Sequence, residues 1–467
     1  MCGSAHAGPN ELHPTGAGMT GRRPMPLKID LHALRSLALM KQYFDAPQLF
    51  SPQTHPALRD DFIAPDQVGP SNAEPRSEPL RSFLFGLLGR GVAQPTAPIP
   101  ARDLRHVLLL RYDALGDYLV TTALMRWIKL HSPDCRISVI SSYRNDGAMR
   151  FDPFIDRRLS IDPRYTFHHS WLSALSLRRE MPVDLVLAPI FTRLSKAATI
   201  ARLAAPDAPA ATFLHPGRAH IYGRAFQFQA AMQPWREHIA QRMLQLGRAS
   251  IDAGTDDTFC PRPHLSFDVH HARQAAEFAR AHALRFNIHD ENVFIHGLDR
   301  EDYDSLSCSG RPYIVFNIAS HMPERNWSVS SCIDLIKQIQ HTWPDLVILL
   351  SGGPQRREDA REICRNVNGT TCLTTENDWL TFCALLAGCE FLISVDSAPV
   401  HVASASGRPA VVLVHKYRAA CEWYPFGIEW RLILSPSNVH LNDIPSTLIF
   451  EAVSQLVDVC SFNLNSD

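Results

Sequence analysis

Short apolar runs that end in small or polar residues and then open into amphipathic stretches recur along this chain from Arg105 onward. This alternation of strand and helix signals predicts an α/β fold with parallel sheets and crossover helices. In the first unit, Val107 to Tyr118, an apolar strand passes through a small-residue turn directly into a helix. Because ligands of parallel sheets bind outside the carboxyl ends of the strands, Asp117 stands where chemistry is expected.

Length, charge and cysteine content narrow the class of protein. The chain has 467 residues, enough for two or three domains, and a formal net charge of -1, so we expect no nucleic-acid partner. Its 11 cysteines are scattered without a Cys-x-x-Cys pair, which argues against a disulfide framework and against a metal site. Without a signal-peptide pattern or a run of about 18 apolar residues, the sequence predicts a cytoplasmic protein.

Residues 1–100 form a Pro-rich N-terminal extension with two helical islands, at 31–43 and 80–92. The second island places Phe83 and Leu87 among arginines. It has two interpretations: a helix docked on the main body, or a helix that lies on a partner or on a bilayer surface, in peripheral contact with the cytoplasmic face of the inner membrane.

The rest of the chain divides into two Rossmann-like domains at 101–305 and 306–467, with an acidic linker around 299–312. The stretch 204–223 is rich in proline and glycine and is predicted to loop across the crevice between the domains. The other expected strands lie at 136–141, 184–188, 313–318, 346–351, 391–395 and 410–415, and the expected helices at 117–131, 194–203, 237–248, 268–285, 328–341, 357–367, 380–387 and 399–406.

Two strand-to-helix junctions of the second domain suit an anion. Asp396 and Ser397 follow a buried strand and precede a helix with Pro399 near its start, where free N–H groups and the helix dipole favour a phosphate. The alternative is that both residues merely cap the helix. The junction at Ser320 to Ser328 carries Arg325, which is either a cation for a leaving diphosphate or a solvated surface arginine.

Together these segments resemble the bacterial heptosyltransferase-like glycosyltransferases, glycosyltransferase family 9. The resemblance lies in Arg-x-Asp-x-x-Gly-Asp at Arg111 to Asp117, and in Asp-Ser-x-Pro-x-His-x-Ala at Asp396 to Ala403 with the later Trp423 to Gly427. The block Ser320 to Trp327 is similar to the family's Lys-x-Trp segment, with Arg325 in the lysine's place. Ala398 departs from the family's usual glycine, and Ser328 from its usual proline.

The resemblance implies a GT-B fold in which the first domain binds the acceptor and the second binds a nucleotide-sugar. It implies an inverting, metal-independent transfer that needs no cofactor. The group transferred would be a heptose or related sugar, and the donor a nucleotide-diphosphate sugar such as ADP-heptose. The acceptor would be a lipopolysaccharide core, a lipid-linked glycan or another surface glycan. Asp117 matches the family's general base, and Arg111 and Gly116 belong to the acceptor side. On the donor side, Ser320, Arg325 and the backbone of Ser397 and Ala398 would stabilise the diphosphate, while Asp396 and His401 would orient the donor.

Other interpretations stay open at this point. Asp117 is alternatively a carboxylate that satisfies a helix N-terminus, and His401 a helix histidine with an ordinary structural role. A two-domain NAD-type oxidoreductase or epimerase is disfavoured because Leu110 to Asp117 lacks Gly-x-Gly-x-x-Gly. The third interpretation is a catalytically silent binding protein that kept the GT-B fold, against which the presence of Asp117 speaks.

Overall fold

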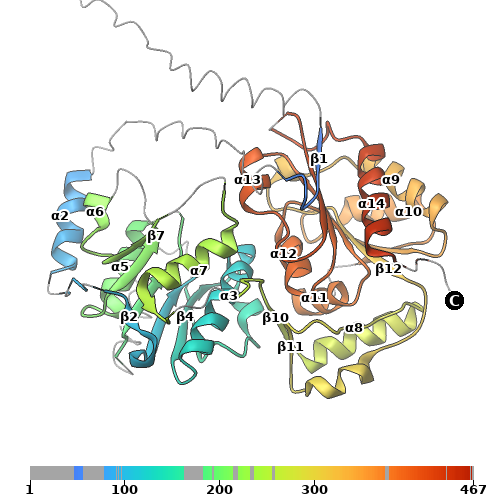
Figure 1. Cartoon of the computed structure of the whole chain (residues 1–467). Helices are drawn as coiled ribbons and strands as arrows, with labels where there is room; N and C mark the ends of the chain where they lie inside the picture. Colours follow the sequence, from blue (N-terminus) through green and yellow to red (C-terminus); the bar gives the residue numbers. More distant parts are fainter. Residues whose placement is uncertain are drawn as a thin grey trace, which may run out of the picture.

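Two large sheets and the helices around them form the main body of the described residues in the computed structural model (Figure 1). The structure describes residues 47–55, 78–90, 92, 94–95, 97–161, 182–191, 194–213, 219–231, 236–254, 258–373, 378–437, 439–462 and 464. The helix predicted at 31–43 lies outside these residues. Parallel strands joined by crossover helices build both sheets, so the predicted α/β class is confirmed.

The first sheet has six parallel strands in the order β5-β4-β3-β6-β7-β8. Alternate residues of the central strand β3 (His106–Leu110) belong to different buried clusters, Val107 and Leu109 to one and Leu108 and Leu110 to the other. A strand covered on both faces is expected to be mostly apolar, and after His106 every residue of this strand is apolar. Its partners are β4 (Arg136–Ser142), β5 (Arg157–Ile161), β6 (Leu185–Ala188), β7 (Ala210–Phe213) and β8 (Phe228–Ala230). The helices around it are α2 (Glu78–Leu88), α3 (Leu115–His131), α5 (Leu194–Ala204), α6 (Ala219–Tyr222) and α7 (Ile239–Ser250).

The second sheet has seven strands in the order β1-β17-β16-β15-β12-β13-β14. Its parallel strands are β12 (Tyr313–Asn317), β13 (Val347–Ser351), β14 (Thr370–Leu373), β15 (Leu392–Val395), β16 (Ala410–Val414) and β17 (Trp430–Leu434). The helices are α9 (Val329–Thr342), α10 (Arg357–Asn366), α11 (Trp379–Ala387), α12 (Ala398–Ala405), α13 (Tyr417–Glu422) and α14 (Ser446–Cys460). Figure 1 shows α12 and α13 on the side of this sheet that faces the first domain.

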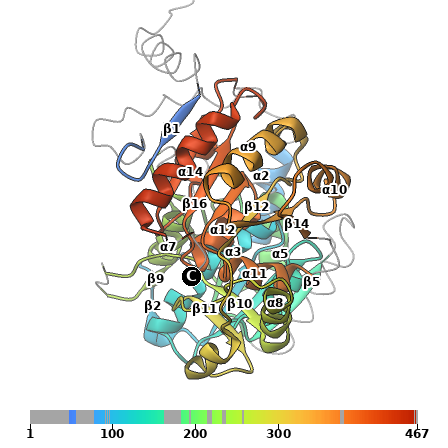
Figure 2. The same ribbon diagram turned by 90° about the vertical axis from the view of Figure 1, so that its right-hand side faces the viewer.

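The N-terminal extension contributes a strand to the second domain. β1 (Gln48–Phe50) pairs antiparallel with β17, and Figure 2 shows it in blue at the edge of that domain. His55 follows it and is fully buried, with Nε2 donating to the Ala420 carbonyl at 2.9 Å. The Pro-rich composition of residues 1–100 gave no signal for this strand, because a three-residue edge strand depends on its partner rather than on its own pattern.

Three elements lie in the sequence after the last strand of the first sheet and before the first parallel strand of the second. They are β10 (Leu265–Asp268), α8 (Val269–Ala281) and β11 (Val293–His296). β10 and β11 pair in parallel, and α8 packs against α11 of the second domain. The remaining short elements are β2 (Ile99–Pro100) paired with β9 (Ile251–Asp252), and the 3-10 turns η2 (Ala101–Asp103), η3 (Asp146–Met149), η4 (Arg300–Leu306) and η5 (Pro323–Arg325).

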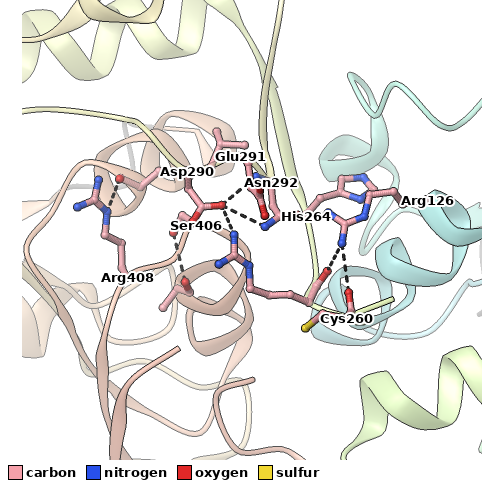
Figure 3. Close-up of polar contacts among 12 residues, drawn as sticks. Arg126, Cys260, His264, Asp290, Glu291, Asn292, Ser406 and Arg408 are labelled. Atoms are coloured by element: carbon pink, nitrogen blue, oxygen red, sulfur yellow. Dashed lines mark hydrogen bonds and ion pairs between the residues drawn. The ribbon is translucent and has the colours of Figure 1, made fainter. Parts of the chain in front are cut away.

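A polar cluster ties α3 to the end of α12 where the chain passes between the domains (Figure 3). Arg126 of α3 donates to the side chain of Asn292, whose backbone N–H donates to Asp290 at 2.8 Å. Arg262 donates to the same Asp290 oxygen. Gly407 follows α12 with a φ of 69°, and a Cβ there would collide with Asp290. The cluster therefore fixes α3 and α12 relative to one another at these ends.

The prediction that 204–223 forms a loop is wrong, because β7 and α6 both lie within it. Two of the four buried residues of β7 are alanine, which weakens the strand signal of this short segment. Helix α3 begins at Leu115, two residues before the predicted start at Asp117. Within the described residues, no helix combines the length and apolar character that crossing a bilayer would need.

Candidate active site

Asp117 is the third residue of α3, directly beyond the carboxyl end of β3. The helix begins after Ala114, whose extended backbone has no side chain able to cap it, and the Oδ2 atom of Asp117 accepts from the Ala114 N–H at 3.2 Å. The side chain remains 19% exposed. Asp117 therefore satisfies a helix N-terminus through Oδ2, as one interpretation predicted, while its Oδ1 atom lies 3.9 Å from Nη1 of Arg111.

A buried arginine lies beneath this carboxylate. Arg111 follows β3 and has no exposed side-chain surface. Its Nη1 donates to Oδ2 of Asp113 at 2.7 Å and lies 3.9 Å from Oδ1 of Asp117. Burial raises the pKa of both carboxyl groups, that of Asp113 to about 6, and Arg111 opposes the rise in each case. Asp113 was not singled out in advance, although its place two residues after Arg111 in the same motif was a usable signal.

The N-terminus of α12 is open to an anion. Ser397 precedes the helix, but its hydroxyl donates back to the Val395 carbonyl at 3.0 Å and does not cap α12. Asn317, at the end of β12, donates to the same hydroxyl at 3.0 Å and so fixes it there. The backbone N–H groups of Ser397 and Ala398 have no partner among the described residues. The expectation that Ser397 merely caps this helix is therefore wrong.

Arg325 belongs to the same site. Its Nη1 donates to the Asp396 carbonyl at 3.1 Å and lies 3.2 Å from the Asp396 carboxylate, so it is not a free surface arginine. Burial raises the pKa of Asp396, and the nearby charges of Arg325, Lys416 and His321 lower it. Lys416 is exposed directly after β16 and is a second cation that the sequence reasoning missed.

Ser320 is less directly placed. It is buried after β12, and its hydroxyl accepts from the Met322 N–H at 3.3 Å, a contact within its own turn. The structure thus joins Arg325 to Asp396, and Asn317 to Ser397, while the contacts of the Ser320 side chain are local.

The two halves of the site meet at Gly116 and His401. A Cβ at Gly116 would lie 3.0 Å from Cδ2 of the His401 ring and 4.0 Å from the Cα of Ala398. Helix α3 therefore approaches α12 at its first turn, and a Cβ at this position would require the His401 ring to move by a few tenths of an ångström. Burial, helped by the charge of Arg325, lowers the pKa of His401 to about 4, so its ring is neutral at pH 7.

The segment Trp423 to Gly427 joins the domains beside this contact. His238, the N-cap of α7, donates from Nε2 to the Tyr424 carbonyl at 2.8 Å, and its ring stacks on Phe426 at a centroid distance of 4.6 Å. Arg242 of α7 pairs with Glu422 at 3.0 Å, with both side chains almost fully buried. Three contacts of different kinds thus hold the first domain against this segment.

A site at the carboxyl ends of parallel strands, with the N-termini of the following helices beside it, suits a nucleotide or another phosphate-bearing ligand. The model of glycosyltransferase family 9 (heptosyltransferase) matches residues 184–420. The chain therefore belongs to glycosyltransferase family 9 and is a glycosyltransferase.

Solved structures share the fold at low sequence identity. A family 9 glycosyltransferase from Veillonella parvula has 18% identity and a TM-score of 0.60, covering 77% of this chain and 99% of its own. ADP-heptose lps heptosyltransferase II from E. coli has 17% identity and a TM-score of 0.56, and the match covers 76% of this chain and 100% of that one. E. coli heptosyltransferase WaaC with ADP-2-deoxy-2-fluoro heptose has 16% identity and a TM-score of 0.55, and the match covers 76% of this chain and 99% of that one. No curated protein sequence matches the chain. The GT-B fold predicted from the motifs is confirmed by these structures.

The buried histidines at the domain interface make a testable prediction about stability. Burial lowers the pKa of His55 from 6.5 to about 4, so the unfolded chain binds a proton at pH 5 that the folded chain does not. This difference should cost about 2 kcal/mol of stability between pH 7.5 and pH 5. The variant His55→Gln keeps a donor for the Ala420 carbonyl. Between pH 7.5 and pH 5 we expect it to lose about 2 kcal/mol less stability than the wild type, as measured by urea denaturation at both pH values.

The exposed His289 supplies the control, because its side chain is 60% exposed and its removal should leave the pH dependence unchanged. An equal loss of stability in wild type and His55→Gln would contradict the assignment of a neutral buried histidine.

Proposed function

We propose that this protein is an inverting, metal-independent heptosyltransferase that moves a heptose or related sugar from ADP-heptose, or a similar nucleotide-diphosphate sugar, to a lipopolysaccharide-core or other surface-glycan acceptor. Membership of family 9 and the names of the two E. coli neighbours support the choice of donor and acceptor. The observation that carries the proposal is the contact between Gly116 and His401, which sets Asp117 opposite the open N-terminus of α12.

In the proposed reaction Asp117 is the general base. The acceptor hydroxyl passes its proton to a carboxylate oxygen of Asp117 while the hydroxyl oxygen forms a bond to the anomeric carbon of the donor. The bond from that carbon to the diphosphate breaks on the opposite face, and the nucleoside diphosphate leaves with the electron pair. One displacement of this kind inverts the configuration at the anomeric carbon. Burial raises the pKa of Asp117, which makes it a stronger base than an ordinary exposed carboxylate.

The leaving diphosphate gains negative charge as this bond breaks. Arg325 pairs with Asp396, Lys416 is a second cation near enough to lower the pKa of Asp396, and the N–H groups of Ser397 and Ala398 lie at the positive end of the α12 dipole. Donors placed in advance where charge develops stabilise a transition state without reorganisation. In this proposal the two side-chain cations and the helix N-terminus do the work that a divalent metal does in other sugar transferases, and no cofactor takes part.

Replacing Asp117 with asparagine tests this assignment. The amide keeps the shape of the carboxylate but accepts no proton, so kcat for transfer from ADP-heptose to lipopolysaccharide lacking heptose should fall about 100- to 10,000-fold. Calorimetric affinity for ADP should stay within about twofold, because α12 and Arg325 hold the diphosphate.

Asp156→Asn is the matched control. Asp156 pairs with Lys129 at 2.8 Å at the far end of α3, and its loss should leave transfer unchanged. Unchanged transfer by Asp117→Asn would refute the base assignment. Tight binding of NAD, with no response to sugar nucleotides, would instead favour an oxidoreductase.

The proposal extends to contact with the cytoplasmic face of the inner membrane, through helix α2. One side of α2 is docked on the first domain, with the Phe85 ring 5.2 Å from Tyr222. The other side exposes Phe83 (65%), Leu84 and Leu87. Beside them a groove of about 550 Å³ between α2 and α6 is lined by Arg90 and Arg224 and by no carboxylate of the described residues. Apolar side chains flanked by unopposed cations fit an anionic lipid surface.

Flotation with vesicles containing phosphatidylglycerol tests this contact. The double variant Phe83→Ser and Leu87→Ser should lose most of the vesicle-bound fraction, whereas Val459→Ser, at an exposed position of α14, should keep it. Equal binding by wild type and the double variant would contradict a membrane role for α2.

A further inference from the structure

Arg111 is shared unequally between two carboxylates. Its guanidinium is enclosed, with Nη1 at 2.7 Å from Asp113, Nη1 at 3.9 Å from Asp117, and Nη2 at 3.3 Å from the sulfur of Met243. The short contact goes to Asp113, although Asp117 is the carboxylate at the mouth of the site. Oδ1 of Asp113 is itself buried and has no hydrogen-bond partner among the described residues.

The consequence for Asp117 is electrostatic. A cation within about 4 to 6 Å lowers the pKa of a carboxyl group by about 1 to 3 units, which would make Asp117 a poor base if Arg111 acted on it alone. Asp113 neutralises this cation at short range. With one cation and two carboxylates, the buried group carries a net charge of −1 before proton transfer and none afterwards, so burial favours the uptake of a proton by Asp117.

The ionisable groups on α12 and α7, the helices around Asp117, do not supply the negative charge that Asp113 places beside Arg111. On α12 the nearest ionisable side chain is His401, which is neutral because its pKa lies near 4. On α7, Met243 is the residue in contact with Arg111, and the cation of Arg242 is paired with Glu422 at 3.0 Å.

We propose that Asp113 is a positioning residue for the transfer reaction: its carboxylate holds and neutralises Arg111, so that Asp117 keeps one oxygen free and basic for the proton of the acceptor hydroxyl. This inference rests on the proposed role of Asp117 as the base. It assigns a function to the second acidic position of the Arg-x-Asp-x-x-Gly-Asp motif that is separate from binding either substrate.

The test is the pH dependence of kcat/KM for transfer from ADP-heptose in Asp113→Asn. The amide oxygen still accepts from Arg111, so the turn keeps its shape, but the neutralising charge is lost and Arg111 acts on Asp117 alone. The acidic limb of the profile should move to lower pH by about 1 to 3 units. The plateau kcat should fall about tenfold, because a base with a lower pKa takes the proton less readily.

Two further variants separate charge from structure. Asp113→Glu keeps the negative charge and should keep the wild-type midpoint, while Asp113→Ser offers a second neutral acceptor if the asparagine variant does not fold. Circular dichroism and calorimetric binding of ADP check the fold and the donor site. Asp156→Asn is again the control, because its partner Lys129 lies about 18 Å along α3 from Asp117.

The two proposals fail in different ways. If Asp117→Asn transfers normally, the proposed base is wrong and the acidic limb has another origin. If Asp117 is confirmed as the base but Asp113→Asn leaves the limb in place or moves it to higher pH, the role of Asp113 is refuted alone. A loss of ADP affinity with an unchanged midpoint would also refute it, since that result would make Asp113 a binding residue.

Discussion

The N-termini of α3 and α12 meet where Gly116 packs against the ring of His401, so closely that a Cβ at Gly116 would require the ring to shift. The arrangement of the candidate site depends on this contact. It brings the first turn of α3, which carries Asp117, to the start of α12, which presents the N–H groups of Ser397 and Ala398. The cluster around Asp290 fixes the far ends of the same two helices, so their relative position is held at both ends. A single buried apolar cluster includes both Tyr118 of α3 and Val400 of α12, which extends the core through the domain interface.

The charges of the candidate site are arranged in two groups of opposite sign. Two carboxylates, Asp113 and Asp117, face the single cation of Arg111, which leaves an excess negative charge that we propose serves the acceptor. Two cations stand near the single carboxylate of Asp396, which leaves an excess positive charge that we propose serves the diphosphate. Burial strengthens both groups, because charges removed from water interact more strongly with each other and with a bound substrate.

Local patterns in the sequence predicted most of the two Rossmann-like domains and the principal site residues. The apolar runs at β3 and β15 are long and are followed by turn residues, so Asp117 and Asp396 could be placed at strand ends before the fold was known. What the sequence did not reveal depends on contacts between distant segments. The strand β1 is defined by its pairing with β17, and Lys416 becomes a site residue only because β16 lies beside β15. The unequal sharing of Arg111 depends on distances that no spacing of residues determines.

The central claim is that the facing helix N-termini form one active site. A crystal structure of this protein with ADP-2-deoxy-2-fluoro heptose would test it most directly. We expect the diphosphate to lie at the N–H groups of Ser397 and Ala398 with Arg325 beside it. The anomeric carbon should then lie within about 6 Å of a carboxylate oxygen of Asp117, a distance that one acceptor oxygen spans. A donor bound away from α12, or a sugar directed away from Asp117 beyond the reach of one intervening oxygen, would contradict the account.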